Sequence, residues 1–443
     1  MSFARTEETP RPAAAGEARH GSGRLAGRRM LFVAPDDYPA FRVDLTELFS
    51  RHLVGRGLEV DWSLRRTDEG PESIDERPGE RYILPARRGG GKLSKIVNRL
   101  ATGISRYKLV WRVARGDYDL VQVRDYTFWG FPFLLAARIA NTPFVYWMSY
   151  PMLDARWEMA LRPFAPIGVL GRIVNFVHAG AGKLSYYHFL KRADHVVVQS
   201  KRMREKLEKK GLKRERMTPV EMGVTTARFN PAVVVASADP RLEGRRVIGY
   251  MCSLHFGEPF DVALGALAET RRRGHDAVMV AIGVLAEHER DALADKLAAH
   301  GIPEDAFINT GMLPLAEALG YIKASDVCIS PFQMNPEQEV ATPTKLVEYL
   351  AMGRPVVASV HYDQSEVVGL SGAGLVAAFT GEATGEAIAR LLADRDWAEE
   401  MGARGPAWVK ANRDYARLAD RVDRLYAGLM RESVVEAAVQ PAE

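Results

Sequence analysis

A short segment in the second half of the chain carries residues that could bind a diphosphate. Thr342, Pro343, Thr344 and Lys345 stand at the expected start of a helix, and Glu348 follows about one turn later. The first turn of a helix presents free backbone N–H groups and the positive end of the helix dipole, and both attract anions. The two threonine hydroxyls and the lysine ammonium group add donors, and Glu348 can accept hydrogen bonds from ribose hydroxyls. The same spacing also fits an ordinary capped helix, so the residues alone leave both interpretations open.

The surrounding sequence predicts the elements that position this segment. Residues 327–330 and 355–360 are apolar and typical of buried strands on either side of the helix. Thr342 suits the N-cap, and Pro343 suits the first helical turn, where its missing N–H costs nothing. Gly353 ends the helix. A helix that begins at the carboxyl end of a parallel strand places its ligand at that edge of the sheet.

The chain resembles the family 4 glycosyltransferases, which are retaining enzymes of the GT-B fold. The resemblance is carried by residues 330–358 and by further matches in the same order along the chain: Pro219–Thr225, Arg228–Pro231, Ala277–Gly283, Phe307–Gly311, Ala324–Val327 and Asp414–Tyr426. It extends from about residue 30 to about residue 430 and is more specific in the second half. It implies an α/β protein of the GT-B fold, with two Rossmann-like domains whose parallel sheets face each other across a cleft.

Length and element order also indicate two α/β domains, because 443 residues exceed one ordinary core and apolar strands alternate with helical segments. With the resemblance, we expect a disordered tail at residues 1–28 and an N-terminal acceptor domain at 29–231. A C-terminal nucleotide-sugar domain follows at 240–405, and a helix at 406–430 crosses back to the first domain. Residues 66–80 are charged and contain Pro and Gly, so they predict a loop.

The resemblance implies roles for individual residues. The donor, a nucleoside-diphosphate sugar, would bind the second domain with Lys345 facing the leaving diphosphate. Backbone groups at Gly311 and Met312 are candidates for contact with the base. Charge builds on the departing diphosphate, and preorganised donors aimed at that charge are usually the largest catalytic term.

The chain departs from the family pattern at three places. Ser253 stands where an Arg is common, and no Lys follows it. Val340 occupies the place of the first Glu in an E-x7-E pair whose second member is Glu348. Ser149 stands where a His is common. Ser253 and Ser149 therefore remain candidates for substrate binding, without the charge that the family places there.

Three other residues are candidates to compensate for these departures. His255 and Arg42 could help to neutralise the leaving group, His255 from the second domain and Arg42 from the head of the first helix. We hypothesise that Glu339 replaces the missing acid through a shift of its loop. Unchanged turnover in an E339A variant would exclude that hypothesis.

Charge is distributed unevenly along the chain, although its net value is only +4. Residues 1–231 hold 40 Lys and Arg against 25 Asp and Glu, a balance of +15. Residues 232–443 hold 20 against 31, a balance of −11. The first half is therefore expected to face something anionic, and the second half is not.

Two acid-free basic stretches lie in the first half, at residues 81–116 and 159–193. In the first, apolar and aromatic residues recur at helical spacing among ten Lys or Arg residues. Such a helix can lie on an anionic membrane surface. The alternative is a helix that packs its apolar stripe on a sheet and exposes a basic face. Nucleic acid is not expected as the partner, because no recognised binding module is present.

The sequence predicts no cofactor and no metal site. Asp117 and Asp119 form a D-x-D pair, but they lead directly into a buried strand, where a role at the strand entry is expected. The two cysteines, Cys252 and Cys328, have neither a zinc-ligand spacing nor the number needed for a disulfide framework. We therefore expect a cytoplasmic protein that can associate with the inner face of the membrane.

Three functions remain open from the sequence. The first is a metal-independent retaining hexosyltransferase that acts on a glycan or lipid-linked acceptor in polysaccharide or glycolipid biosynthesis. The second is a degenerate GT-B protein that binds a ligand without catalysis, which the residues at positions 149, 253 and 340 suggest. The third is a sugar-nucleotide epimerase of the same fold, which isomerisation without an acceptor would reveal.

Overall fold

The computed structural model describes residues 23–40, 42–151, 186–252, 256–336 and 338–439, with residues 154, 157, 168, 171, 173, 174, 176 and 254. Ser253, His255, most of the second basic stretch and the expected tail up to residue 22 lie outside the described residues. The chain divides into two compact units. The described residues of the N-terminal unit lie within 23–221 and 418–439, and those of the C-terminal unit lie within 222–417.

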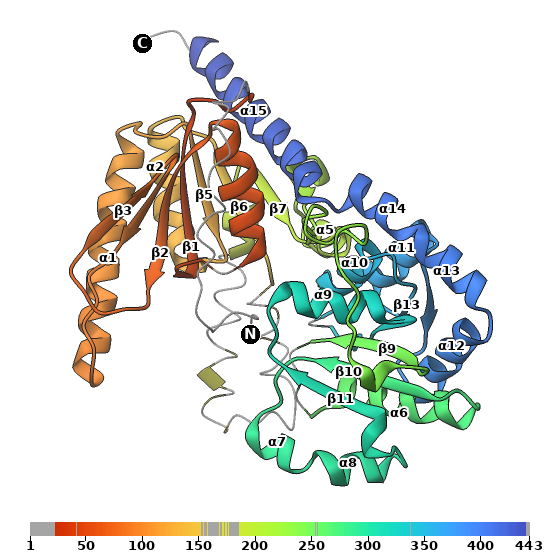
Figure 1. The fold of residues 1–443 in the computed structure, drawn as a ribbon. Helices are drawn as coiled ribbons and strands as arrows, with labels where there is room; N and C mark the ends of the chain where they lie inside the picture. Colours follow the sequence, from red (N-terminus) through yellow and green to blue (C-terminus); the bar gives the residue numbers. More distant parts are fainter. Residues whose placement is uncertain are drawn as a thin grey trace. The chain divides into compact units, whose positions relative to one another are not determined.

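The N-terminal unit is built on an eight-stranded sheet with the order β3-β4-β2-β1-β5-β6-β7-β8 (Figure 1). Its strands are β1 (Arg29–Tyr38), β2 (Glu59–Arg66), β3 (Ser73–Arg77), β4 (Glu80–Leu84), β5 (Leu120–Arg124), β6 (Phe144–Met148), β7 (His195–Val198) and β8 (Met217–Pro219). All neighbouring strands are parallel except β3 and β4. The register places Met30 of β1 opposite Val60 on one side and Leu120 on the other.

Strand composition explains why this sheet is buried on both faces. Every residue of β5 and β6 is buried, as expected for parallel strands that helices cover on both sides. In β1, the ring of Phe32 packs against Phe49 and Trp62, with ring centroids 4.8 Å apart in both pairs. The second half of β1 contains Asp36 and Asp37 and is only half buried. The polar end of the central strand therefore marks the carboxyl edge of this sheet.

The helices of this unit are a π-helix, η1 (Asp44–Leu53), then η2 (Val54–Arg56), α1 (Lys92–Ala114), α2 (Thr127–Ile139), α5 (Lys201–Glu208) and η3 (Arg214–Arg216). Residues 23–28 form a turn whose Leu25 is buried. The last helix, α15 (Tyr415–Val439), belongs to the N-terminal unit from Leu418 onward. There Arg421 pairs with Glu221 at 2.9 Å, and the hydroxyl of Tyr426 donates to Gln122. No described helix combines the length and the apolar character needed to cross a bilayer.

Two sequence-based expectations for this unit are wrong. The predicted loop at residues 66–80 contains β3, which pairs antiparallel with β4 through a turn where Gly79 adopts a φ of +74°. Charged residues along β3 suit an exposed sheet edge, where they oppose pairing with other chains. The second expectation concerns α1, whose apolar stripe was given a possible place on the sheet. That alternative is wrong because the stripe is exposed to solvent.

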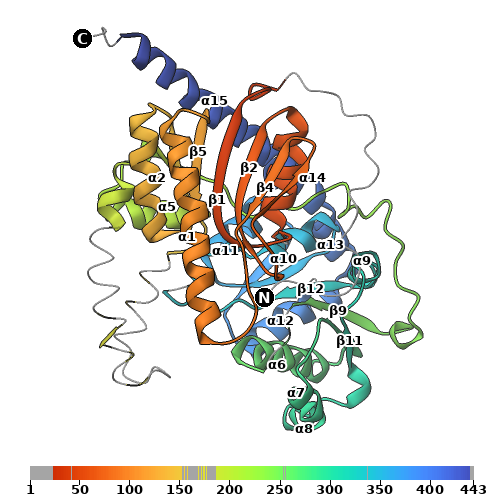
Figure 2. The same ribbon diagram turned by 90° about the vertical axis from the view of Figure 1, so that its left-hand side faces the viewer.

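The C-terminal unit contains a six-stranded parallel sheet with the order β11-β10-β9-β12-β13-β14 (Figures 1 and 2). Its strands are β9 (Arg246–Met251), β10 (Ala277–Ile282), β11 (Phe307–Gly311), β12 (Val327–Ser330), β13 (Val356–Ser359) and β14 (Gly374–Ala377). Its helices are η4 (Pro240–Leu242), α6 (Glu258–Arg272), α7 (Glu287–Asp291), α8 (Leu293–Ala299), η5 (Glu304–Ala306), α9 (Leu315–Ala324), α10 (Thr344–Ala351), α11 (Tyr362–Ser371), α12 (Gly381–Ala393), α13 (Arg395–Ala403) and α14 (Gly405–Asn412).

Two apolar clusters form the core of this sheet. One joins α6 and α12 to alternate residues of the strands, such as Met279 and Ile329. The other joins α9 and α10 to the intervening residues, such as Val280 and Cys328. Successive strand residues point to opposite faces, so the two clusters lie on opposite sides of the sheet. The described structure is thus an α/β fold with two sheets, and strand order changes direction next to β9 and β12, the strands that carry the candidate site.

Candidate functional site

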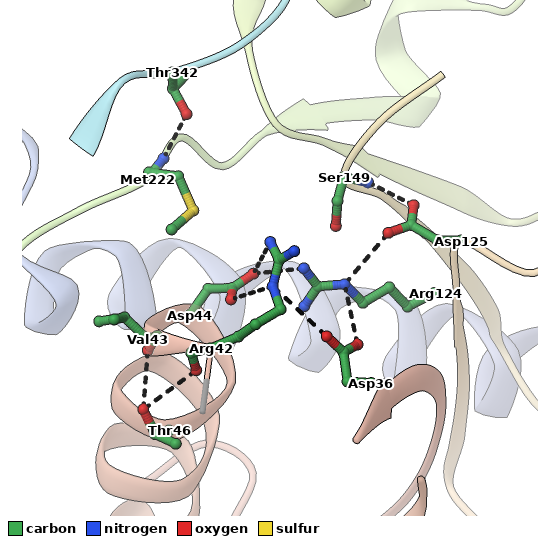
Figure 3. A network of polar contacts seen from close by, with 10 residues as sticks. All are labelled: Asp36, Arg42, Val43, Asp44, Thr46, Arg124, Asp125, Ser149, Met222 and Thr342. Atoms are coloured by element: carbon green, nitrogen blue, oxygen red, sulfur yellow. Dashed lines mark hydrogen bonds and ion pairs between the residues drawn. The ribbon is translucent and has the colours of Figure 1, made fainter. Parts of the chain in front are cut away.

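Helix α10 begins close to the carboxyl end of β12, as the sequence predicts. The helix starts at Thr344, and Pro343 occupies the N-cap without a side-chain cap. The prediction that Thr342 is the N-cap is therefore wrong by one residue. The hydroxyl of Thr342 instead accepts a hydrogen bond from the backbone N–H of Met222 at 3.2 Å (Figure 3). No side chain caps the first turn of α10, so its N–H groups are suited to a ligand.

A buried tyrosine fixes the position of α10. The hydroxyl of Tyr349 accepts from the backbone N–H of Met251 at 2.8 Å and donates to the Met251 carbonyl at 3.2 Å. Met251 is the last residue of β9, the strand beside β12 in the sheet. Leu346, Val347 and Leu350 of α10 are also buried in the core. These contacts hold the start of the helix at the carboxyl edge of the sheet.

Lys345 and Glu348 form the charged part of this site. Burial raises the pKa of Glu348 to about 7, although the ammonium group of Lys345 opposes the shift. Lys345 also opposes the rise that burial causes in the pKa of Cys252, the residue after β9. Its charge therefore acts on the ends of two neighbouring elements. Within the described part of the chain, the Lys345 ammonium group forms no ion pair, so it is available to an anion.

The loop before α10 is folded by a turn at Asn335. The backbone N–H of Glu339 donates to the Asn335 carbonyl at 2.9 Å, and the Gln338 carbonyl lies 2.9 Å from Nε2 of the buried His361. Val340, where the family places an acid, is only 1% exposed. Glu339 is half buried beside it. The structure thus places a carboxylate next to the family position, although it does not place one at that position.

Gly311 and Met312 lie at the end of β11. Gly311 adopts a φ of +68°, which favours glycine, and a side chain there would meet no atom within 4 Å. The Gly311 carbonyl accepts from the backbone N–H of Gly283 at 3.1 Å. Met312 is exposed. Both residues therefore border open space at the carboxyl edge of the C-terminal unit, where base contacts were expected.

A second polar cluster lies at the carboxyl edge of the sheet in the N-terminal unit, and sequence reasoning identified only its Arg42 and Ser149 (Figure 3). Nε of Arg42 lies 3.2 Å from Oδ1 of Asp44. The buried Arg124, at the end of β5, lies 2.9 Å from Oδ2 of Asp44 through Nη2. Burial opposes ionisation of Asp44, but the two guanidinium groups outweigh it and hold its pKa below the usual value. The charge of Arg42 is therefore already partly compensated within its own unit.

Ser149 and Asp125 complete this cluster. The backbone N–H of Ser149 donates to Oδ1 of Asp125 at 2.8 Å. Among the described residues, the buried Oγ of Ser149 has no hydrogen-bond partner. Burial raises the pKa of both Asp36 and Asp125, although Arg124 opposes each shift. The arrangement of carboxyl, hydroxyl and guanidinium groups is suited to binding hydroxyl-bearing ligands.

The signal for this cluster was present in the sequence. Asp36 follows the first apolar strand, and Arg124 and Asp125 end another. Charged residues at the ends of neighbouring parallel strands meet at one edge of a sheet. Ser253 and His255 lie outside the described residues, and no group of three metal-ligating side chains occurs within the residues described.

Two family models match the chain in sequence. The model described as glycosyl transferases group 1 matches residues 245–394, and the model of the glycosyl transferase 4-like domain matches residues 45–223. No curated protein matches the chain. The two family matches fall on the C-terminal and N-terminal units respectively.

Several solved glycosyltransferase structures have the same architecture. The chain is similar to sucrose-phosphate synthase from Thermosynechococcus elongatus at 18% identity and a TM-score of 0.64, over 91% of this chain and 100% of that one. It is similar to WaaG, a glycosyltransferase involved in lipopolysaccharide biosynthesis, at 14% identity and a TM-score of 0.62, over 90% of this chain and 100% of that one. It is similar to Anabaena HepE in complex with UDP-glucose at 14% identity and a TM-score of 0.61, over 90% of this chain and 100% of that one.

Fold and family therefore agree on the class of protein. The two α/β sheets and their helices define a two-domain GT-B fold. The chain belongs to the glycosyl transferases group 1 family and carries the glycosyl transferase 4-like domain in its N-terminal unit.

Proposed function

We propose that this glycosyltransferase moves a hexosyl group from a nucleoside-diphosphate sugar to a membrane-associated glycan or lipid, with retention and without a metal ion. Such a reaction belongs to polysaccharide or glycolipid biosynthesis. The observation that carries the proposal is the uncapped start of α10, where Lys345 and the first backbone N–H groups lie at the carboxyl edge of the sheet. UDP-glucose is the first donor to test, because HepE was solved with UDP and with UDP-glucose.

The chemical task of this site is to stabilise the departing diphosphate. Fixed backbone N–H groups, the helix dipole and one ammonium group are aimed at the place where negative charge grows. Glu348, one turn later, is placed to accept from ribose hydroxyls once it is ionised. In the N-terminal unit, Ser149, Asp125 and Arg42 are the proposed contacts for acceptor hydroxyls. Glu339 is the proposed substitute for the acid that Val340 replaces.

The test is a panel of nucleoside diphosphates and nucleotide sugars, first for stabilisation and then for transfer. At about one hundred times its dissociation constant, the correct donor adds about 2.7 kcal/mol to the free energy of unfolding. Transfer is expected to continue in EDTA, and NMR of the first-formed product should show the anomeric configuration of the donor. Failure of every nucleotide to stabilise the protein would contradict the donor site.

A degenerate, ligand-binding protein is the second candidate, and the buried Val340 favours it. An apolar side chain there cannot contact a donor sugar as a carboxylate would. This candidate predicts stabilisation by a nucleotide together with neither transfer nor donor hydrolysis. Turnover with any donor in the panel would exclude it.

A further inference from the structure

An exposed apolar stripe runs along the whole of α1. Its six residues are between 55% (Ile96) and 74% (Leu93) exposed, and the others are Leu100, Ile104, Tyr107 and Trp111. Their spacing of three or four residues places all six on one side of a helix. On the opposite side, Ser105, Leu109 and Val113 are buried against the unit. The stripe is therefore a largely exposed face about 30 Å long, since each helical residue rises by about 1.5 Å.

The first half of α1 is held only loosely by its own unit. None of the described side chains between residues 93 and 104 is buried. Figures 1 and 2 show this end of the helix projecting beyond the strands of its sheet. The second half is fixed to α2 through Tyr107 and Trp129, whose ring centroids are 5.3 Å apart. An apolar helix end that projects into water without a partner is costly, and it indicates a docking surface.

Helix α2, which lies beside α1, carries exposed apolar residues of its own. Leu135 and Ile139 lie one turn apart on α2 and are 65% and 68% exposed. The two helices lie side by side in both views (Figures 1 and 2). The docking surface is defined here as the stripe of α1 together with these two residues of α2.

The charge around this surface identifies its partner as anionic. Lys95, Arg99 and Arg115 are exposed, and in the described part of the chain no acid pairs with them. Lys108 and Arg112 are already paired, with Glu72 at 2.6 Å and with Asp117 at 3.1 Å. At the amino end of the helix, a hollow of about 400 Å³ is lined by Arg87, Arg88 and Lys95 among other residues. Unpaired positive charge therefore lies beside the amino-terminal half of the stripe, at Lys95 and Arg99, and beyond its carboxyl end, at Arg115.

We infer that the docking surface binds an anionic phospholipid bilayer, with α1 lying in the interface. The apolar stripe would enter the acyl region, while the flanking basic groups would contact lipid phosphates. Tyr107 and Trp111 have the amphipathic rings that favour the boundary between headgroups and hydrocarbon. The inference rests on the proposed function for its purpose, which is to bring the enzyme to a membrane-borne acceptor.

Flotation of the full chain with lipid vesicles tests this inference. Vesicles of phosphatidylcholine with about 30 mol% phosphatidylglycerol should bind the protein at about 0.05 M salt, and about 0.5 M salt should weaken binding. Each basic group near the surface contributes about fivefold, so K95Q/R99Q should lower the partition coefficient about 25-fold. L100D/I104D should lower it by about tenfold or more. The matched control is V235D in the C-terminal unit, where Val235 is 84% exposed, and it should bind normally.

Several outcomes would overturn the inference. They are the absence of flotation, equal binding to pure phosphatidylcholine, or an equal loss in V235D. Self-association of the protein that L100D/I104D abolishes, without vesicle binding, would assign the surface to a second copy of the chain. Stabilisation by nucleotide sugar is measured on the same variants without vesicles. It should be unchanged in both double variants, so failure of the donor site and failure of the docking surface are distinguishable.

Discussion

Lys345 lies in the first turn of α10. No described residue forms an ion pair with its ammonium group. K345A removes the positive charge that, in the proposed function, faces the departing diphosphate, so we expect turnover to fall by about 10²–10³-fold. E339A is expected to lower turnover less, because Glu339 would position the sugar without facing the leaving group. K410A, at an exposed lysine of the same unit, is the control in the steady-state assay. A K345A enzyme with normal turnover would contradict the assignment of this site.

Glu348 gives the donor site a predicted pH dependence. Burial raises its pKa to about 7, so in the free protein the carboxyl group is largely protonated below that pH. Ribose hydroxyls bind better to the ionised form, and the affinity for a nucleotide sugar should therefore rise with pH. A group with a pKa near 7 changes its ionised fraction about tenfold between pH 6 and 8. The affinity for the nucleotide sugar should therefore change by at most about tenfold over this range.

Calorimetric titration with a nucleotide sugar at several pH values measures this dependence. The diphosphate of a nucleotide sugar is esterified at both ends, so the ligand contributes no titration near neutrality. E348Q should bind with an affinity that no longer changes across this pH range. A pH dependence that persists in E348Q would assign it to another group, such as a histidine.

At the scale of the element, α10 depends on one buried hydroxyl for its position. Y349F leaves the backbone N–H of Met251 without its partner inside the core. We expect a loss of about 1–3 kcal/mol in the free energy of unfolding, measured by urea denaturation, and weaker donor binding. Y107F, where the ring is exposed, should change neither quantity. Full donor affinity in Y349F would show that the helix keeps its place without this contact.

The end of β5 depends in the same way on Arg124. R124M removes a buried guanidinium group and leaves Asp44 as a buried carboxylate without its closest partner. Breaking a buried ion pair in this way typically costs about 3–5 kcal/mol, and denaturant unfolding should show a loss of that size. R115M, which removes an exposed arginine, is the control. A loss below about 1 kcal/mol would mean that water or a rearranged side chain solvates the carboxylates.

The elements show which parts of the fold could be predicted from sequence. Strands such as β10 are continuous apolar runs, and α10 has clear start and stop residues, so both were predictable. Strand β3 was not, because its charged residues lack an alternating apolar pattern and its pairing with β4 depends on a turn. The stripe of α1 has the spacing of a packed helix. The periodicity of the sequence shows that α1 has an apolar stripe. It does not show whether that stripe faces the protein or the solvent.

The candidate site was predictable to a similar extent. The proposed donor residues fall within one segment, so local spacing and the family resemblance together made Lys345 and Glu348 candidates. The N-terminal cluster brings together Asp36, Arg124 and Ser149, which lie at or just after the ends of three different strands. Only the strand order places these residues at one edge, and strand order is not written in local spacing.

At the scale of the whole molecule, each unit has its own sheet and its own core. We therefore expect two transitions in differential scanning calorimetry. A saturating nucleotide sugar should raise the midpoint of one transition and leave the other unchanged, because the proposed donor site lies in the C-terminal unit. K345A should reduce that shift. A single transition that moves as a whole would contradict independent unfolding of the units.

Helix α15 has a consequence for the order in which the chain acquires its structure. Residues 418–430 supply buried side chains, among them Tyr426, to a unit whose other residues precede position 222. During synthesis, the N-terminal unit emerges first but cannot complete its core until the final helix has emerged. The C-terminal unit can be complete while the ribosome still holds the final helix, so the later-translated body is expected to finish folding before the earlier one.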